Sequence, residues 1–317
     1  MALTINTNLS SMIVQSNLNK STNQLNQAIE RMTTGYKINH ASDNAAGYSI
    51  ARNWEAKLGS LDVAADNAAT GADMLSTLED HYALISSHVQ RVRDLTEQAA
   101  NGTYGAQSRD AIESEIKARL EEINRIAANC EFNGIDLMSG GSAYSTGLNI
   151  QVGTDSSDTK SKIFLDNDLF ADGGVVALFT TQNATGYTGY TPTAGTMPED
   201  ATAEQIAAAK LANIAKDCAG NGTVVGGAAK MLDHIDKVIN KISDRITKLG
   251  AAQNRIESAI ESIGVQSENI TSSLSTLRDA DVATESSNYI KAQILQQASA
   301  TLLATANQSP SIALNLL

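Results

Sequence analysis

Residues 235–277 read IDKVINKISDRITKLGAAQNRIESAIESIGVQSENITSSLSTL, and this stretch decides the fold. Two sets of positions repeat every seven residues, and the second set lies four residues after the first. The sets are Ile235, Ile242, Leu249, Ile256, Ile263, Ile270 and Leu277, and then Ile239, Ile246, Gln253, Ile260, Ser267 and Leu274. Eleven of these 13 positions are Ile or Leu and no Pro interrupts them. The spacing therefore predicts a coiled-coil helix.

The length of this segment predicts the shape of the molecule. At about 1.5 Å per residue the helix is roughly 65 Å long, so we expect an elongated molecule. The polar Gln253 and Ser267 are expected to fix the register against partner helices. The spacing alone leaves one alternative open, a helix packed in a globular helical bundle.

The composition excludes several classes of protein. The chain has 317 residues, enough for two or three domains, and its aromatic content is 4%. The net charge of −12 argues against nucleic acid as a partner, because phosphates need Lys and Arg. The sequence has no apolar run of 18 residues, which argues against membrane insertion. Its start lacks the basic and apolar regions of a secretory signal peptide.

Both ends of the chain are poor in charge. Residues 1–19 carry no ionisable side chain, and residues 292–317 carry none either. Apolar side chains recur there at helical spacing, so we expect two helices that pair with each other and with copies of the chain. Alone in water these ends are expected to be disordered. Pro310 is expected to end the second helix. The positions expected to carry self-assembly are Leu18, Leu25, Ile29, Met32, Ile294, Leu295, Leu302 and Leu303.

The rest of the chain predicts a mainly α fold: an elongated coiled-coil helical rod with paired terminal helices and a small β-containing outer insert. Helices are expected at 44–100, 106–129, 201–217 and 231–277, and strands at 148–152, 162–165 and 175–180. Residues 181–200 are expected to form a loop. The expected domains are 1–43 (first terminal helix plus linker), 44–174 (rod), 175–222 (variable outer domain), 223–277 (rod) and 278–317 (second terminal helix).

The sequence lacks motifs of catalysis and metal binding. H-E-x-x-H, G-x-S-x-G and the phosphate-binding G-x-x-x-x-G-K-[ST] are absent. His81 and His88 lie one heptad apart, but no third ligand is spaced to complete a zinc site. We expect no catalytic residue, no metal and no cofactor. Cys130 and Cys218 are expected to be free thiols, with a bridge between them as the alternative.

Several motifs resemble bacterial flagellin, the filament subunit. The resemblance covers about residues 1–153 and 228–317, and the insert between them carries none of it. The motifs are Thr34-Gly-Tyr-Lys-Ile-Asn, Ala41-Ser-Asp-Asn-Ala-Ala-Gly47, Phe132-Asn-Gly134, Ile150-Gln-Val-Gly153, Leu249-Gly-Ala-Ala-Gln-Asn-Arg255, Arg278-Asp-Ala-Asp281 and Ala306-Asn-Gln-Ser-Pro310.

The resemblance implies a non-enzymatic subunit that polymerises into the extracellular flagellar filament. It implies export through the flagellar type III apparatus, and it implies an export chaperone and hook-associated and cap proteins as partners. It also implies a surface for vertebrate Toll-like receptor 5. The matching residues are Gln90, Arg91, Leu95 and Glu115. We expect one helix face to present them; the alternative is that they serve filament packing alone.

Three other functions remain as alternatives. The first is the hook–filament junction protein of the same superfamily. The second is an enzyme displayed on a filament, with the catalytic part in the insert. Deletion of residues 175–222 is expected to leave assembly intact. The third is a cytoplasmic coiled-coil scaffold, which predicts charged termini, and the termini of this chain are uncharged.

Overall fold

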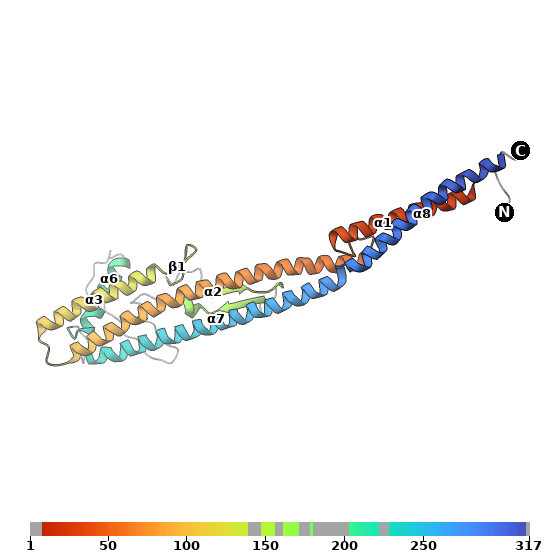
Figure 1. Cartoon of the computed structure of the whole chain (residues 1–317). Coiled ribbons are helices and arrows are strands. Elements are labelled where there is room, and N and C mark those ends of the chain that lie inside the picture. The colour runs from red at the N-terminus through yellow and green to blue at the C-terminus, as the bar shows by residue number, and fades with distance from the viewer. Residues whose placement is uncertain are drawn as a thin grey trace. The chain divides into compact units, whose positions relative to one another are not determined.

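A computed structural model shows the fold of the chain (Figure 1). The structure describes residues 8–138, 147–155, 161–170, 178–179, 203–221 and 228–314. The chain divides into two compact units: unit 1 takes in Met1–Ser60 and Val265–Leu317, and unit 2 takes in Leu61–Gly264. The division falls inside two long helices, so the domain boundaries expected at 43/44 and 277/278 stay predictions.

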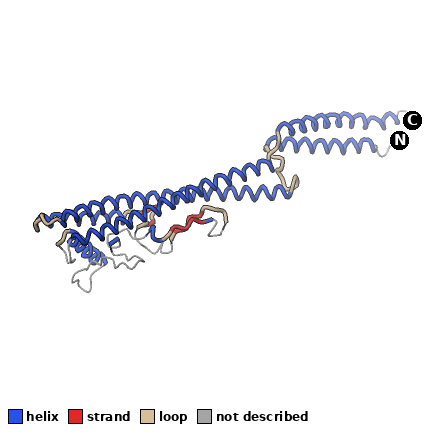
Figure 2. Tube along the Cα trace, turned by 90° about the horizontal axis from the view of Figure 1, so that it is seen from below, coloured by secondary structure: helices blue, strands red, loops and turns tan. Residues whose placement is uncertain are grey.

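The described residues are mainly helical, as predicted (Figure 2). The helices are α1 (Leu9–Thr34), α2 (Ala45–Ala100), α3 (Ala106–Ala128), α6 (Ala203–Cys218), α7 (Ala228–Arg278) and α8 (Val282–Leu314). The strands are β1 (Glu131–Phe132), β2 (Ile135–Asp136), β3 (Leu148–Gln151) and β4 (Lys162–Leu165), and Asn167–Phe170 is a short 3₁₀ helix. The predicted helices at 44–100, 106–129, 201–217 and 231–277 are confirmed.

In unit 2, buried side chains recur every three or four residues along the long helices. The buried positions of α2 follow these steps from Leu61 to Ala99, and they join the inner faces of α3 and α7 in one core. Side chains repeating in this way keep one stripe of a helix turned toward its neighbours. Along α7 the buried stripe consists of Ala228, Met231, Ile235, Val238, Ile242, Arg245, Leu249, Ala252, Ile256 and Ile263.

One of the two predicted heptad sets in α7 is confirmed within unit 2, and the other is displaced by one residue. Val238 and Ala252 are buried, whereas the predicted Ile239 and Ile246 are only half buried and pack at the edge of the core. The apolar stripe is wider than a two-position seam because α7 contacts more than one element. Gln253 donates to Glu79 Oε2 of α2 at 2.9 Å, so its partner lies in the same chain.

Arg245 is a charged residue inside the core of unit 2, and its burial was not predicted from the sequence. It is 2% exposed, and its Nη1 donates to the hydroxyl of Tyr82 at 3.2 Å. That hydroxyl donates in turn to the carbonyl of Leu169 at 3.2 Å. Burial raises the pKa of Tyr82 to about 12, against the opposing effect of the Arg245 charge. The three residues connect α7, α2 and the 3₁₀ helix.

Two antiparallel hairpins follow α3. β1 and β2 are joined by Asn133 and Gly134, whose φ angles of 52° and 74° suit the two-residue turn that Asn-Gly favours. β3 pairs with β4, as predicted at 148–152 and 162–165, and buries Ile150. A Cβ on Gly71 of α2 would lie 2.6 Å from Ile150 Cδ1, so glycine permits this close approach.

The insert is only partly described. The strand predicted at 175–180 is wrong in its described part, because Leu178 and Phe179 are helical and buried. The remainder of that segment and the loop predicted at 181–200 lie outside the described residues. The described Gly220 has a φ of 74° directly after α6, where glycine is favoured.

The insert helix α6 packs against α3 and belongs to the core of unit 2. Its buried side chains are Leu211, Ile214, Ala215 and Cys218. Cys130 and Cys218 are free, as predicted, and both are fully buried. Deletion of 175–222 would uncover this core, so we no longer expect it to be harmless.

The prediction that Pro310 ends the last helix is wrong, since α8 continues to Leu314. Proline lacks the N–H that would bond the carbonyl four residues earlier, which is that of Ala306. In unit 1 this carbonyl accepts a hydrogen bond from Asn8 Nδ2 at 2.8 Å. A side chain of the opposite terminus therefore satisfies the acceptor that proline leaves open.

Candidate functional site

Helices α1 and α8 lie side by side in unit 1 (Figures 1 and 2). In the described parts of the two helices, the buried side chains are small or polar: Ser21, Ala28, Glu285, Ala292 and Ser299. Small side chains let helix backbones approach closely, but they bury little apolar surface. The pair therefore has a weak core of its own.

Hydroxyl and amide groups join the two helices where charged side chains are missing. Ser11 Oγ donates to Asn307 Oδ1 at 2.7 Å, and Gln296 Nε2 donates to Thr22 Oγ1 at 3.2 Å. Neutral hydrogen bonds of this kind contribute about 1 kcal/mol each. These contacts give the amide-rich termini a structural role within the pair.

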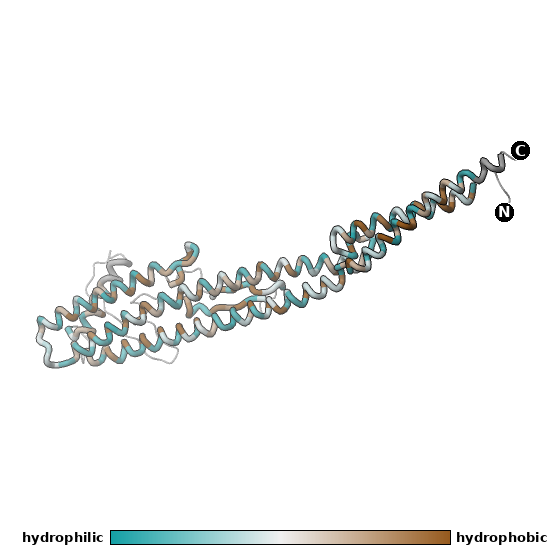
Figure 3. Tube along the Cα trace, viewed as in Figure 1, coloured by the Kyte–Doolittle hydropathy of each residue, from teal (hydrophilic) through white to brown (hydrophobic). Residues whose placement is uncertain are grey.

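Hydrophobic and hydrophilic residues alternate along both helices (Figure 3). Most of the large apolar side chains of α1 and α8 are exposed. Ile294 is 59% exposed and Leu302 is 57% exposed. Patches of this kind mark interaction surfaces. The exposed large apolar residues of the two helices are Leu9, Met12, Ile13, Ile29, Met32, Val282, Ile290, Ile294, Leu295 and Leu302. We call these ten residues the assembly surface.

The structure divides the eight predicted assembly residues into two groups. Leu18, Leu25 and Leu303 are half buried. The other five belong to the assembly surface: Ile29, Met32, Ile294, Leu295 and Leu302. Leu9, Met12 and Ile13 were not predicted, although their spacing of three and four residues within the uncharged N-terminal stretch is typical of an apolar helix face.

Two of the family-like motifs meet in unit 1. The linker after α1 forms a bridge between Tyr36 and Asp279. The backbone N–H of Lys37 donates to the carbonyl of Arg278 at 2.7 Å, and that of Ala280 donates to Gly35 at 2.8 Å. The turn between α7 and α8 is therefore pinned to the turn between α1 and α2.

Arg278 holds this junction with its side chain as well. Its guanidinium lies 4.0 Å from the ring centroid of Tyr36 and forms an ion pair with Glu55 of α2. Arg52 and then Arg278 lower the pKa of Glu55. Cation–π contact and ion pairing both favour the charged guanidinium here.

The receptor residues suggested by the resemblance do not share one exposed face. Arg91 Nη2 lies 2.9 Å from Glu115 Oε1, and both side chains are exposed, as is Gln90. Leu95, however, is 2% exposed and belongs to the core of unit 2. The expectation that one face presents all four is wrong for Leu95, because Leu95 is an inward-facing residue of α2.

The described residues offer little for catalysis. They contain no group of three or more His, Cys, Asp or Glu that could hold a metal ion. Both thiols have pKa values raised to about 12 by burial, so neither is an activated nucleophile. None of the described helices has both the length and the apolarity needed to span a bilayer.

Comparison with known proteins places this helical arrangement in a family. Residues 5–143 match the bacterial flagellin N-terminal helical region, and residues 232–317 match the bacterial flagellin C-terminal helical region. Flagellin A of Vibrio anguillarum is 33% identical over 380 aligned residues, which cover 100% of both chains. The chain belongs to the bacterial flagellin family. Flagellins are structural subunits that self-assemble into the flagellar filament.

One further relative agrees with this assignment, and one solved structure shares the fold. Polar flagellin F of Vibrio parahaemolyticus is 30% identical over 379 aligned residues, again covering 100% of both chains. A solved chain described as a flagellar hook-associated protein from Vibrio parahaemolyticus has a TM-score of 0.55 at 14% identity. It covers 75% of this chain and 100% of that chain. At this identity the likeness concerns the fold alone.

Proposed function

We propose that this flagellin polymerises through unit 1 and that neighbouring copies cover the assembly surface with their own α1 and α8 helices. One observation supports the proposal above all: in unit 1 the large apolar side chains face outward while small ones face inward. A monomer gains nothing from that arrangement. A helical polymer does, because each copy covers apolar residues of the next copy and the same head-to-tail contact repeats at every step.

The missing charges fit this role energetically. Burying an ion without a partner costs several kcal/mol, so an uncharged surface can be desolvated at low cost. Burying one exposed Ile or Leu contributes about 1.5–3 kcal/mol. Covering Ile29, Met32, Ile294, Leu295 and Leu302 therefore supplies a large driving force for association.

Seeded polymerisation of the purified chain tests this function. Electron microscopy should show long tubes growing from short filament seeds. Persistence of monomers under the same conditions would count against the proposal. In cells, motility of a strain whose sole filament gene is this one provides the corresponding measurement.

The route of export is part of the same proposal. We expect the chain to leave the cell unfolded through the flagellar type III apparatus, held before export by a chaperone at its apolar ends. The support is the exposed apolar surface of unit 1, which needs cover before assembly. The chain should appear in the medium of a wild-type strain, and its appearance in an export-deficient strain would contradict this route.

A second candidate function concerns Toll-like receptor 5. The exposed ion pair of Arg91 and Glu115 supports it, with Gln90 beside them. We expect Arg91→Ala and Glu115→Ala to weaken receptor activation at least tenfold, since central charged contacts often dominate an interface. Arg125→Ala is the matched control, because Arg125 forms a comparable exposed pair with Glu122. Equal responses of all three variants would refute the assignment.

The hook–filament junction protein remains the alternative function. A junction protein shares the terminal helices but fills a fixed number of positions. In the seeded assay its growth would stop after a short cap, whereas a filament subunit continues to add. Filament length as a function of added protein therefore separates the two.

A further inference from the structure

We propose that the ion pair between Arg31 and Glu285 sets the register in which α1 and α8 pair, and so decides which apolar residues the assembly surface presents together. The proposal rests on the proposed function. Arg31 and Glu285 are positioning residues: they act through the helix pair rather than by touching a neighbouring copy.

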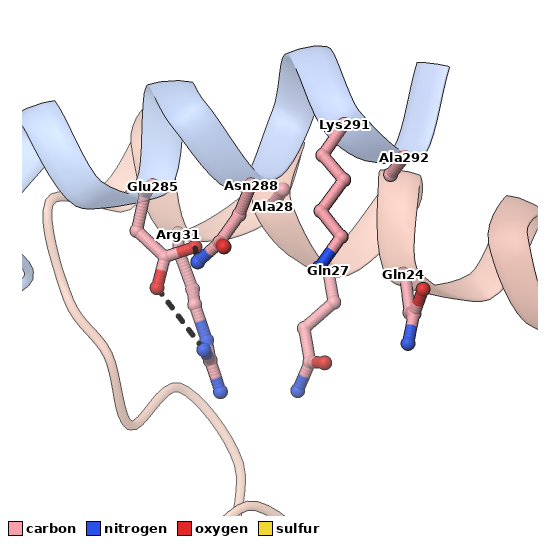
Figure 4. A pocket seen from close by; sticks show the side chains of 8 residues that line it. All are labelled: Gln24, Gln27, Ala28, Arg31, Glu285, Asn288, Lys291 and Ala292. Atoms are coloured by element: carbon pink, nitrogen blue, oxygen red, sulfur yellow. Dashed lines mark hydrogen bonds and ion pairs between the residues drawn. The ribbon is translucent and has the colours of Figure 1, made fainter. Parts of the chain in front are cut away.

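The pair is built from opposite ends of the chain and is largely withdrawn from solvent. Arg31 Nη1 lies 3.1 Å from Glu285 Oε1, with side-chain exposures of 26% and 10%. Asn288 donates to the second carboxylate oxygen at 3.4 Å. Figure 4 shows the guanidinium and the carboxylate meeting beside a cavity of about 250 Å³, which Gln24 and Lys291 help to line.

Helix ends add to the attraction. Arg31 lies in the last turn of α1, and Glu285 lies in the first turn of α8. A cation is favoured at a helix C-terminus and an anion at an N-terminus. Each charge therefore suits both its partner and its own helix.

Apart from this pair, the buried side chains of α1 and α8 specify the register poorly. On α8 the buried residues Glu285, Ala292 and Ser299 lie seven residues apart, and on α1 Ser21 and Ala28 do the same. If α8 slipped by one heptad along α1, small residues would again occupy the buried positions. Glu285 is the only charged member of its heptad column, which continues with Ala306. Among the buried side chains, the ion pair is therefore the contact that distinguishes the observed register from its neighbours, and it acts beside the turns that pin residues 35–37 to residues 278–280.

The consequences of a slip follow from the sequence. Sliding α8 one heptad along α1 in one direction brings Glu285 opposite Gln24, where the buried carboxylate has no cation. Sliding it the other way carries Glu285 beyond Thr34, where α1 ends, and brings Ala292 opposite Arg31. In both cases a buried charge loses its partner, which is strongly unfavourable. Both slips also displace Ile294 relative to Ile29 by two helical turns, and a neighbouring copy would no longer fit.

Charge reversal and charge exchange test the pair in the full-length chain. We expect Arg31→Glu and Glu285→Arg each to slow seeded elongation at least about tenfold. The double exchange Arg31→Glu/Glu285→Arg should recover the rate to within about threefold, with a small deficit because the helix ends now oppose each charge. Lys291→Gln, in the same cavity, is the matched control and should elongate within about twofold of the parent.

A cross-link reads the register directly. Thr22 and Gln296 are joined by a 3.2 Å hydrogen bond, so a short bifunctional thiol reagent should cross-link Thr22→Cys/Gln296→Cys in assembled parent filaments. Thr22→Cys/Tyr289→Cys and Thr22→Cys/Leu303→Cys report the two slipped registers. Cys130 and Cys218 are buried and should not interfere. Any polymer formed by Arg31→Glu or by Glu285→Arg should lose the cross-link between positions 22 and 296, and the double exchange should restore it.

The outcomes separate this inference from the function on which it rests. If the parent chain fails to elongate from seeds, the proposed function fails. If the parent elongates and the single reversals keep its rate and the Thr22–Gln296 cross-link, the register proposal is overturned while the function stands. A double exchange that restores neither growth nor the cross-link overturns it as well.

Discussion

Units 1 and 2 use similar apolar spacing in opposite ways. In unit 2 the three- and four-residue steps place side chains such as Leu75, Ile116 and Ile242 in a core where each is fully buried. In unit 1 the buried positions of α1 and α8 are small, and residues such as Ile294 remain exposed. Helical periodicity therefore identifies the contact stripe of a helix, but it does not show whether the same chain or another copy covers that stripe.

The largest expected effect comes from removing one helix of unit 1. Deleting residues 292–317 should abolish seeded polymerisation, because α1 would lose most of its partner and three of the ten residues of the assembly surface would be gone. Unit 2 should keep its melting temperature. Cys130 and Cys218 should remain unreactive toward alkylating reagents, and rapid alkylation would show that the two units depend on each other.

Removing the insert should damage the other unit. Deletion of 175–222 takes away Leu211, Ile214 and Cys218, which are buried in the core of unit 2. We expect a loss of several kcal/mol, since each buried aliphatic side chain contributes about 1.5–3 kcal/mol. Deletion of 181–200 alone is the control. A deletion of 175–222 that leaves the denaturation midpoint unchanged would show that α6 is dispensable.

A matched pair of substitutions sharpens the contrast. Ile242→Ala in unit 2 should cost about 2–5 kcal/mol of unfolding free energy, because it leaves a cavity in a packed core. Ile294→Ala in unit 1 should leave monomer stability within about 0.5 kcal/mol and raise the critical concentration for assembly. Urea denaturation and sedimentation of filaments measure the two quantities. The account fails if Ile294→Ala destabilises the monomer as much as Ile242→Ala does.

The smallest effect concerns a surface ion pair of unit 2. Lys248 Nζ lies 2.6 Å from Asp168 Oδ2, and this contact lowers the pKa of Asp168. A carboxyl group whose pKa is lower in the folded state than in the unfolded state stabilises the protein at pH values above its unfolded-state pKa. This stabilisation is lost as the pH falls through the folded-state pKa. Both side chains are more than 40% exposed, so Asp168→Asn should cost less than about 1 kcal/mol at pH 7. The difference in melting temperature from the parent should shrink toward pH 3, and a constant difference would exclude this cause.

The sequence predicted the helices well and the contacts less completely. The long α2 and α7 helices follow from periodicity, and the strands β3 and β4 were predicted at 148–152 and 162–165. The strands β1 and β2 were not predicted, although Asn133-Gly134 favours a hairpin turn. The burial of Arg245 could not be foreseen, because a charged side chain in a core depends on a partner such as Tyr82 from a distant helix. Where α8 passes through Pro310, the open carbonyl of Ala306 accepts a hydrogen bond from Asn8, which is still more remote in the chain.

The candidate site was predicted in the same uneven way. The missing charges at both ends pointed to a shared interface, and five of the eight predicted assembly residues are exposed. Leu95 was misplaced, because an apolar residue matched by motif carries no information about which side of α2 it faces. The Arg31–Glu285 pair was missed, because pairing two charges 254 residues apart requires the register of the helices.

Hydrogen exchange of the free chain and of the filament tests the central claim most directly. If neighbouring copies hold unit 1 together, backbone amides of α1 and α8 should exchange rapidly in the monomer and at least about a hundredfold more slowly in the filament. Amides of α3, in unit 2, should change little. Equal protection of α1 and α8 in the monomer and in the filament would contradict the account.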